Sequence, residues 1–266
     1  MSGPPPDAVA RVLLDGRVHH ARPHAAGLVL DDGRVLAEDA VTWLPPVAPG
    51  GTVIALGLNY AAHAQELARE LARPVESEPL VFFKTAGSLR GHRGRTQRPA
   101  GVQFMHYECE LAVVIGRTAW RVPAAEALAH VAGYTVANDW AVRDHLENWL
   151  RPNLRVKNRD GATVLGPWLV PAARVPDPHA LALRTFVNAA LTQQGHTSNM
   201  VHGIPALIEY LSSFMPLAPG DIILTGTPEG VVDVPVGAEV VCEIDGIGRL
   251  VNTLVDAPAD GPAAGT

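Results

Sequence analysis

The 266-residue sequence has little cysteine, since Cys109 and Cys242 are the only two. Both lie inside apolar runs typical of strands, where a free thiol behaves as a small buried apolar group. Two such residues cannot build the disulfide framework of a small secreted protein, and their scarcity is typical of a reducing compartment. We therefore predict a cytoplasmic protein.

Long apolar runs and excess positive charge are also lacking. No run of about 18 apolar residues exists, which excludes a membrane-spanning helix, and the N-terminal MSGPPPDAVAR lacks the basic and apolar regions of a signal peptide. The formal net charge is −6 and the pI is near 6.0. We expect neither a membrane nor a nucleic acid as partner, because nucleic-acid binding requires a basic surface.

Several motifs that mark common enzyme classes are missing. The sequence has no glycine-rich phosphate loop, no H-E-x-x-H, no paired C-x-x-C and no G-x-S-x-G. A nucleotide-dependent enzyme, a zinc protease and a serine hydrolase of the elbow type are therefore disfavoured.

What the chain does contain is apolar residues, glycine and proline. Hydrophobic residues make up 47% and charged residues 18%, which is enough for one sizeable core. The 25 glycines and 23 prolines are typical of many short strands joined by turns. Asp-Gly turns between apolar runs over residues 11–43 predict a small antiparallel meander. We predict a small β domain over 1–50 with an unordered start, a main domain over 51–256, and a disordered tail over 257–266.

Residues 106–116, HYECELAVVIG, predict a strand in which Glu108 and Glu110 project on the same side, roughly 7 Å apart. Two neighbouring carboxylates repel each other and lose solvation unless a cation lies between them. Mg²⁺, which prefers carboxylate oxygens, would resolve both problems. The alternative is an edge strand with a solvated face, although the apolar run that follows favours a strand entering the core.

Asp139 offers a third carboxylate, at the end of a strand predicted over 133–138. Its alternative role is an Asx turn or the N-cap of a helix predicted over 141–150. His63 and Glu66, three residues apart on a helix predicted over 61–72, share one face. They are either an exposed pair or part of a lid over 63–78.

Other elements follow from apolar periodicity and turn residues. We predict further strands at 52–57, 79–84, 222–225, 239–244 and 248–252, a hairpin over 181–188 and 191–194, and helices over 124–131 and 204–213. Arginine-rich loops are expected at 87–99 and at 151–167, the latter containing Lys157. The first loop could attract an acidic small molecule or form a solvated surface.

Five segments, in this order, resemble the fumarylacetoacetate hydrolase family: GLNYAAHAQEL, YECELAVVIG, GYTVANDWAVRD, RPNLRVKNRDG and GDIILTGTPEGV. The set is most similar to the decarboxylase/isomerase branch of the homoprotocatechuate pathway. Leu58 stands where acylpyruvate hydrolases of the family typically carry Arg, which favours that branch over hydrolysis.

The resemblance implies a mixed, β-rich α+β fold, a β-roll or barrel behind the small N-terminal meander, and usually a homodimer. It implies Mg²⁺ or Mn²⁺ held by Glu108, Glu110 and Asp139 in a catalytic domain over 51–256. It also implies catalytic roles for three residues: Lys157, His63 and Glu66. Three further residues are predicted to bind the substrate: Arg143, Asp144 and Thr227.

The implied function is metal-dependent decarboxylation of 5-oxopent-3-ene-1,2,5-tricarboxylate and isomerisation of 2-hydroxyhepta-2,4-diene-1,7-dioate, through a dienolate stabilised by the metal. The expected partner is thus a small 2-oxo di- or tricarboxylate. Two alternatives remain: an acylpyruvate-type C–C hydrolase or oxaloacetate decarboxylase of the same family, and a catalytically silent binding protein.

Overall fold

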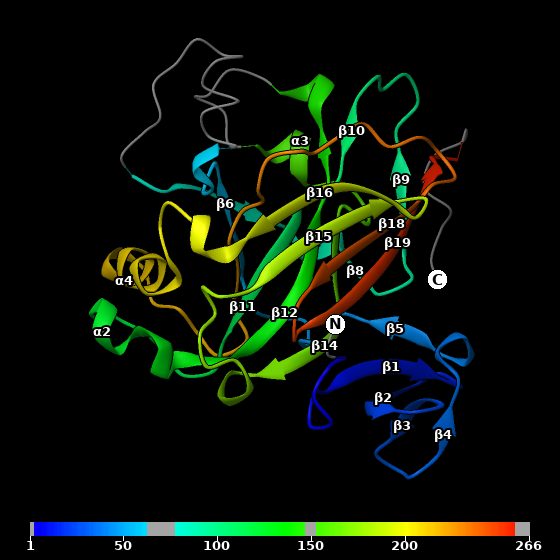
Figure 1. Cartoon of the computed structure of the whole chain (residues 1–266), viewed down its shortest axis with the longest axis horizontal. Coiled ribbons are helices and arrows are strands. Elements are labelled where there is room, and N and C mark those ends of the chain that lie inside the picture. The colour runs from blue at the N-terminus through cyan, green and yellow to red at the C-terminus, as the bar shows by residue number, and fades with distance from the viewer. Residues whose placement is uncertain (1–2, 63–77, 147–152, 259–266) are drawn as a thin grey trace.

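The computed structural model describes residues 3–62, 78–146 and 153–258. Strands are the commonest regular structure in these residues and form four sheets (Figure 1). Among the described helices, none combines the length and apolar character needed to cross a membrane. Both cysteines are free and buried, as predicted.

The first sheet is the predicted N-terminal meander, with strand order β4-β3-β2-β1-β5. Its strands are β1 (Ala10–Leu14), β2 (Arg17–His24), β3 (Gly27–Leu30), β4 (Val35–Leu36) and β5 (Thr42–Leu44). The sheet joins the main core through Trp43, whose ring packs edge-on against Trp168 at a centroid distance of 5.3 Å. Asp7 and Ala8 lie in the stretch expected to be unordered, yet Asp7 forms an ion pair with Arg174 and Ala8 is fully buried.

Two further sheets form the main body, and one covers a face of the other (Figure 1). The seven-stranded sheet contains, in order, β7 (Leu80–Lys84), β6 (Val53–Gly57), β17 (Ile222–Leu224), β11 (Cys109–Ile115), β12 (Val131–Asp139), β14 (Thr163–Pro171) and β8 (Leu89–Gly91). The five-stranded sheet contains β16 (Ala190–His196), β15 (Ala182–Val187), β18 (Glu239–Ile244), β19 (Gly248–Asp256) and β9 (Arg95–Arg98).

Strand β11 lies in the middle of the seven-stranded sheet and is buried throughout. Its odd-numbered side chains, such as Leu111 and Val113, enter the large core. Ala112 and Val114 enter a smaller core on the other face. The alternation predicted for this strand is therefore correct, and the solvated edge strand is wrong because both neighbouring positions in the sheet are occupied.

The predicted helix over 204–213 is confirmed as α4 (Ile204–Phe214), with Pro205 in its first turn and Leu207, Ile208 and Leu211 buried. It lies beside α2 (Ala124–Ala127) at one side of the sheets (Figure 1). The helix predicted over 124–131 consists of α2 followed by a 3-10 turn (Leu128–His130), and β12 begins at Val131.

Two predictions near the site need correction. The start of the helix predicted over 141–150 is a strand, β13 (Ala141–Val142), because it pairs with β10 (Met105–His106); residues 147–150 lie outside the described residues. The expected loop over 151–167 contains α3 (Leu154–Lys157) and the first part of β14.

The arginine-rich segment expected to be a loop forms β8 and β9, because each finds a partner strand at a sheet edge. Its arginines make contacts within the chain. Arg90 pairs with Asp160, Arg93 with Glu38 at 2.9 Å, and Arg98 with Asp233 at 3.3 Å. These contacts favour the surface interpretation of this segment over a ligand-binding one.

His92, between β8 and β9, predicts a pH-dependent contribution to stability. Its Nδ1 accepts the Val251 N–H at 3.1 Å, and burial, reinforced by Arg93 and Arg249, lowers the pKa of His92 to about 3. The unfolded chain takes up a proton below about pH 6.5 that the folded chain does not bind until about pH 3. This contribution to stability is therefore complete above pH 6.5 and is lost as the pH falls towards 3, by up to about 1.4 kcal/mol per pH unit.

The test is urea unfolding of the wild type and His92→Asn between pH 4 and 8. Asparagine can still accept the Val251 N–H but does not titrate. The free energy of unfolding of the His92→Asn variant should therefore fall less steeply with decreasing pH than that of the wild type. The matched control is His24→Asn, because exposed His24 also accepts a backbone N–H, that of Ala26, through Nδ1. Equal slopes for wild type and His92→Asn would contradict the prediction.

Candidate metal centre

The acidic residues singled out in the sequence come together on one face of the seven-stranded sheet. Glu110 shares its face of β11 with Ala112 and Val114, which line the smaller core. In the antiparallel ladder Glu110 lies opposite Ala137, and the Asp139 N–H donates to the Glu108 carbonyl at 2.9 Å. Residues opposite each other in such a ladder point to the same side. Glu108, Glu110 and Asp139 therefore converge.

These three side chains each offer a carboxylate oxygen, and the oxygens lie within 4.8 Å of one another. Glu110 and Asp139 are fully buried, and Glu108 is partly exposed. Asp139 is the last residue of β12, and its side chain faces other charged groups. Its alternative role as a helix N-cap is wrong, because a strand follows it.

Two buried lysines lie against this cluster. Lys157, at the end of α3, places Nζ 2.6 Å from Glu108 Oε2 and 3.0 Å from Asp139 Oδ2. Lys84, at the end of β7, contacts Asp139 Oδ1 and the carbonyl oxygen of Lys157. Two ammonium groups thus compensate Glu108 and Asp139. No described cation contacts Glu110.

The protonation equilibria follow from this arrangement. Burial, together with the carboxylates of Asp139 and Glu108, raises the pKa of Glu110 well above its usual value. Burial on its own lowers the pKa of Lys157, but Asp139, Glu108 and Glu110 outweigh it and raise the pKa. Burial also lowers the pKa of Lys84, and there it outweighs the attraction of Asp139. Three carboxyl groups thus face two lysines, and Glu110 is the carboxyl whose charged form is disfavoured by burial and by its acidic neighbours.

Glu110 also tests whether these residues fit a divalent cation. Its Oε2 accepts the Gly226 N–H at 2.6 Å, but its Oε1 is buried and has no hydrogen-bond partner. A buried carboxylate oxygen without a partner is costly, and a cation shared with Glu108 and Asp139 would satisfy it. Three carboxylates are a typical ligand set for Mg²⁺ or Mn²⁺. The residues fit such an ion.

The sequence-based prediction missed Lys84. It appeared only as the last residue of a strand, with nothing to link it to Asp139, 55 residues further along the chain. A signal was present, because Lys84 and Lys157 are the only lysines among the 21 basic Lys and Arg residues. All other basic side chains are arginines, so both lysines of the protein lie at the acidic cluster.

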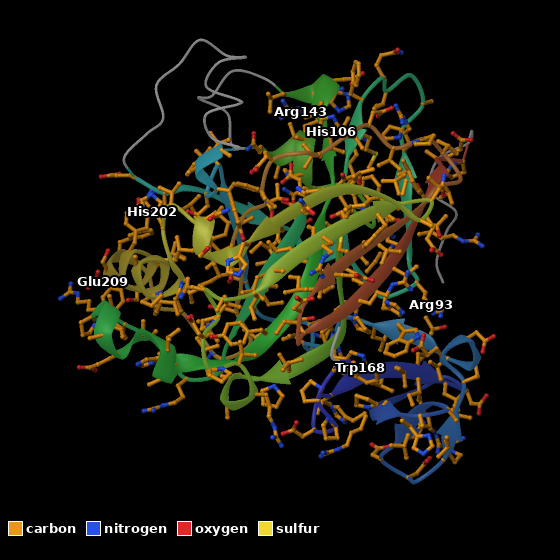
Figure 2. The ribbon with its side chains drawn as sticks, in the orientation of Figure 1. Arg93, His106, Arg143, Trp168, His202 and Glu209 are labelled. Atoms are coloured by element: carbon orange, nitrogen blue, oxygen red, sulfur yellow. The ribbon has the colours of Figure 1, made fainter. Side chains whose placement is uncertain are left out.

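The residues expected on the substrate side differ in their positions and contacts. Thr227 is buried in the turn after β17, and its Oγ1 accepts a hydrogen bond from Gln193 at 2.9 Å. Arg143 lies near β10, close to His106 in Figure 2. Asp144 is exposed, and its two oxygens accept the N–H groups of Gln103 and Phe104, which lowers its pKa. Asp144 thus supports the loop before β10.

His63 and Glu66 lie outside the described residues, as does all of the lid expected over 63–78 except Glu78. Their proposed roles remain predictions.

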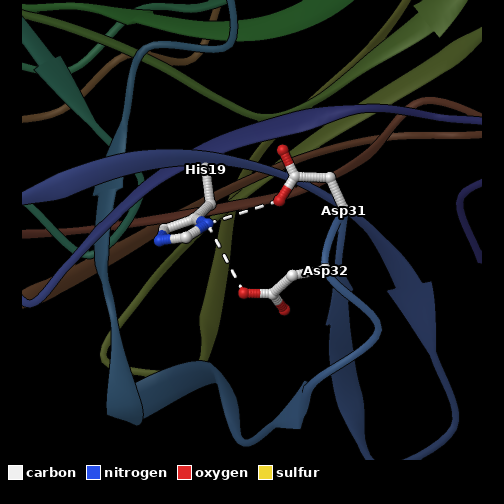
Figure 3. A group of neighbouring side chains, drawn as sticks. All are labelled: His19, Asp31 and Asp32. Atoms are coloured by element: carbon white, nitrogen blue, oxygen red, sulfur yellow. Dashed lines mark hydrogen bonds and ion pairs between the residues drawn. The ribbon is translucent and has the colours of Figure 1, made fainter.

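A second group of potential ligands lies in the N-terminal sheet, where His19 Nδ1 is 3.3 Å from Asp31 Oδ1 and 3.9 Å from Asp32 Oδ2 (Figure 3). Both aspartates are exposed, and Asp32 pairs with Arg34 at 2.7 Å. Exposed groups that are already paired with each other and with a guanidinium do not need a cation. This group therefore lacks what distinguishes Glu110, a buried carboxylate oxygen without a hydrogen-bond partner.

Comparison with known proteins identifies the family. The sequence model of the family described as "Fumarylacetoacetate (FAA) hydrolase C-terminal" matches residues 52–255. The chain belongs to this family. The family recognised from the sequence motifs is thus confirmed, and so is the β-rich fold.

Within the fumarylacetoacetate hydrolase family, the chain is 54% identical over 237 residues to a 4-hydroxyphenylacetate degradation bifunctional isomerase/decarboxylase of Salmonella dublin. That match covers 87% of this chain and 54% of the relative. It is 51% identical to a homoprotocatechuate catabolism bifunctional isomerase/decarboxylase of Escherichia coli, covering 92% of this chain and 54% of the relative. The chain thus spans about half the length of these curated relatives.

Solved structures extend the comparison. The 5-carboxymethyl-2-hydroxymuconate delta-isomerase from Mycobacterium smegmatis superposes with a TM-score of 0.82 at 36% identity, covering 94% of this chain and 99% of that one. The fumarylpyruvate hydrolase from Pseudomonas aeruginosa, solved with Mn²⁺ and pyruvate, gives a TM-score of 0.71 at 32% identity, covering 82% and 93%.

Proposed function

We propose that this protein catalyses metal-dependent decarboxylation of 5-oxopent-3-ene-1,2,5-tricarboxylate and isomerisation of 2-hydroxyhepta-2,4-diene-1,7-dioate. The observation that carries the proposal is the unpartnered Oε1 of buried Glu110, whose carboxylate lies beside those of Glu108 and Asp139. The identity of 51–54% to bifunctional isomerase/decarboxylases supports the choice of reaction within the family.

Glu108, Glu110 and Asp139 are the proposed ligands of Mg²⁺ or Mn²⁺. When bound, such an ion supplies Lewis-acid chemistry by polarising the keto group of a chelated 2-oxo acid. With three protein ligands, the ion would remain accessible to substrate and water.

The roles of the chain's own residues follow from their positions. Lys157 Nζ lies against two of the proposed ligands, so its positive charge would stabilise negative charge that develops on a substrate bound there. Lys84 holds Asp139 in place from the other side. Thr227 lies in the adjoining turn, and Arg143 is the proposed partner of a distal substrate carboxylate. His63, oriented by Glu66, is the proposed proton shuttle for moving the double bond.

Two alternatives use the same residues. An acylpyruvate-type hydrolase or oxaloacetate decarboxylase would use the same carboxylates, and the solved fumarylpyruvate hydrolase with Mn²⁺ and pyruvate makes this the second candidate. A catalytically silent member would bind a 2-oxo acid without converting it. Both are outcomes of the assay below.

The assay measures CO₂ release and the ultraviolet absorbance of the dienol together, with the tricarboxylate and the dienedioate as substrates. We expect both activities in Mg²⁺ or Mn²⁺, loss of both after treatment with EDTA, and recovery on adding the metal back. Turnover of an acylpyruvate without turnover of either proposed substrate would favour the hydrolase. Turnover that survives complete metal removal would contradict the proposed mechanism.

The proposal also includes the organisation of the protein. We propose a catalytic domain over 51–256 and a small β domain over 1–50, with a tail over 257–266 of which residues 259–266 lie outside the described residues. From the family we further propose that the protein is a cytoplasmic homodimer. Light scattering would measure the mass of the assembly.

A further inference from the structure

The peptide unit between Thr225 and Gly226 is next to the Glu110 carboxylate, and both its N–H and its carbonyl oxygen are hydrogen-bonded. Its N–H, from Gly226, donates to Glu110 Oε2 at 2.6 Å. Its carbonyl oxygen, from Thr225, accepts a hydrogen bond from Asn59 Nδ2 at 2.9 Å. Because the peptide is planar, fixing the direction of the carbonyl also fixes the direction of the N–H.

Asn59 is suited to hold this peptide because both of its side-chain N–H groups and its Oδ1 are hydrogen-bonded. Nδ2 also donates to the His202 carbonyl at 3.0 Å, and Oδ1 accepts the His202 N–H at 2.9 Å. The opposite orientation of the amide would place an oxygen against two carbonyl oxygens, so only this orientation is satisfied. Asn59 thus joins the Thr225 peptide to the segment before α4, where His202 lies in Figure 2.

The position of Asn59 follows from the sheet. Strands β6 and β17 are parallel neighbours, so the residues that follow them meet at the same edge. Asn59 is only 2% exposed. A Cβ on Gly226 would lie 3.0 Å from the Asn59 Cβ, and Gly226 has φ +88°, a conformation that favours glycine. The two residues therefore pack closely enough for Asn59 to set the peptide plane.

The rest of the turn has a separate anchor. Gln193 Nε2 donates to Thr227 Oγ1 at 2.9 Å and to the Pro228 carbonyl at 2.7 Å. Thr225 itself is also held to β11, because its N–H and Oγ1 both donate to the Leu111 carbonyl, at 3.2 and 2.8 Å. Loss of Asn59 would therefore free the Thr225 carbonyl, and with it the tilt of the Thr225–Gly226 peptide plane, while Thr225, Thr227 and Pro228 keep their other contacts.

We propose that Asn59 is a positioning residue for the metal centre: through the Thr225–Gly226 peptide it orients Glu110 so that Oε1 faces Glu108 and Asp139. This inference rests on the proposed function, because it treats Glu110 as a metal ligand. Groups that orient a metal ligand typically contribute 10- to 100-fold to affinity.

The first measurement is Mn²⁺ affinity by calorimetry. We expect Asn59→Ala to raise the dissociation constant about tenfold. Asn59→Ser, which retains one donor and leaves a smaller cavity, is the second variant and should show a smaller rise in the same direction. The matched control is Ser212→Ala in α4, which also removes a buried hydrogen bond, that from the Val122 N–H, and should bind Mn²⁺ like the wild type.

The second measurement reports on the peptide itself in the metal-free protein. Thr225–Gly226 is the only Thr-Gly pair in the sequence, so labelling threonine with ¹³C at the carbonyl and glycine with ¹⁵N leaves one cross-peak in an HNCO spectrum. The Gly226 amide proton should resonate downfield in the wild type, because its hydrogen bond to a carboxylate is short. It should move upfield in Asn59→Ala and stay in place in Ser212→Ala.

The outcomes separate the two proposals. If the wild type binds Mn²⁺ and Asn59→Ala binds it equally well, with the Gly226 cross-peak unmoved, Asn59 is not a positioning residue and the proposed function stands. If the wild type binds no Mn²⁺, the proposed function fails and this inference fails with it. A weaker affinity together with an upfield shift supports both.

Discussion

Glu110→Gln is expected to weaken Mg²⁺ and Mn²⁺ binding on the order of 100-fold or more, and metal-dependent turnover should fall with it. Glutamine keeps the shape of the side chain and an oxygen to accept the Gly226 N–H, but it removes the charge. The metal-free variant should be at least as stable as the wild type, because a buried carboxylate with an unpartnered oxygen and two acidic neighbours destabilises the fold. A variant that loses the metal without losing stability identifies a functional carboxylate.

Calorimetric titration with Mn²⁺ and thermal unfolding in EDTA measure the two effects. Glu243→Gln is the matched control, because Glu243 is also buried and its Oε2 also lacks a hydrogen-bond partner. It lies on β18 in the other sheet and should not affect metal binding. Wild-type affinity in Glu110→Gln would mean that the ligand set is wrongly assigned.

Lys157→Met is expected to lower kcat about 100- to 1,000-fold while leaving metal affinity unchanged or higher. The loss is that of one charged group stabilising a developing negative charge, for which effects of this size are typical. Metal affinity should not fall, because the substitution removes a cation that lies against Glu108 and Asp139 and competes for their charge. A fall in kcat with Mn²⁺ binding intact separates this role from that of a ligand.

The same variant should be unusually dependent on metal for its stability. Without Lys157, Glu108 and Asp139 lose a buried ionic partner, which typically costs roughly 3–5 kcal/mol. Saturating Mg²⁺ should recover much of this loss, since a bound ion stabilises the folded state by mass action.

Arg249→Met is the control for this metal dependence. Arg249 pairs with buried Glu243 at 2.9 Å in the other sheet, so Mg²⁺ should not restore stability lost there. Equal responses of the two variants to Mg²⁺ would contradict the proposed position of Lys157 beside the ion.

Elements with a strong local pattern were predictable from the sequence. Helix α4 has apolar residues at helical spacing, and β11 alternates between two faces, so both were found with nearly correct bounds. Strands β8 and β9 were mistaken for a loop, since an arginine- and glycine-rich segment has little intrinsic preference for a strand. Only pairing with β14 and β19 makes them strands.

The sequence by itself determined that Glu108 and Glu110 project to one side, because alternation along a strand is a property of the local backbone. It also carried the motifs that identify the family. Only the tertiary structure decided which distant groups surround those carboxylates. Lys84 and Gly226 contact the cluster from a strand and a turn far away in sequence, and Asn59 contacts the peptide that precedes Gly226. Their meeting depends on strand order and register, which no local pattern encodes. The third carboxylate was visible in the sequence, but its alternative role as a helix N-cap was excluded only when β12 and β13 were seen.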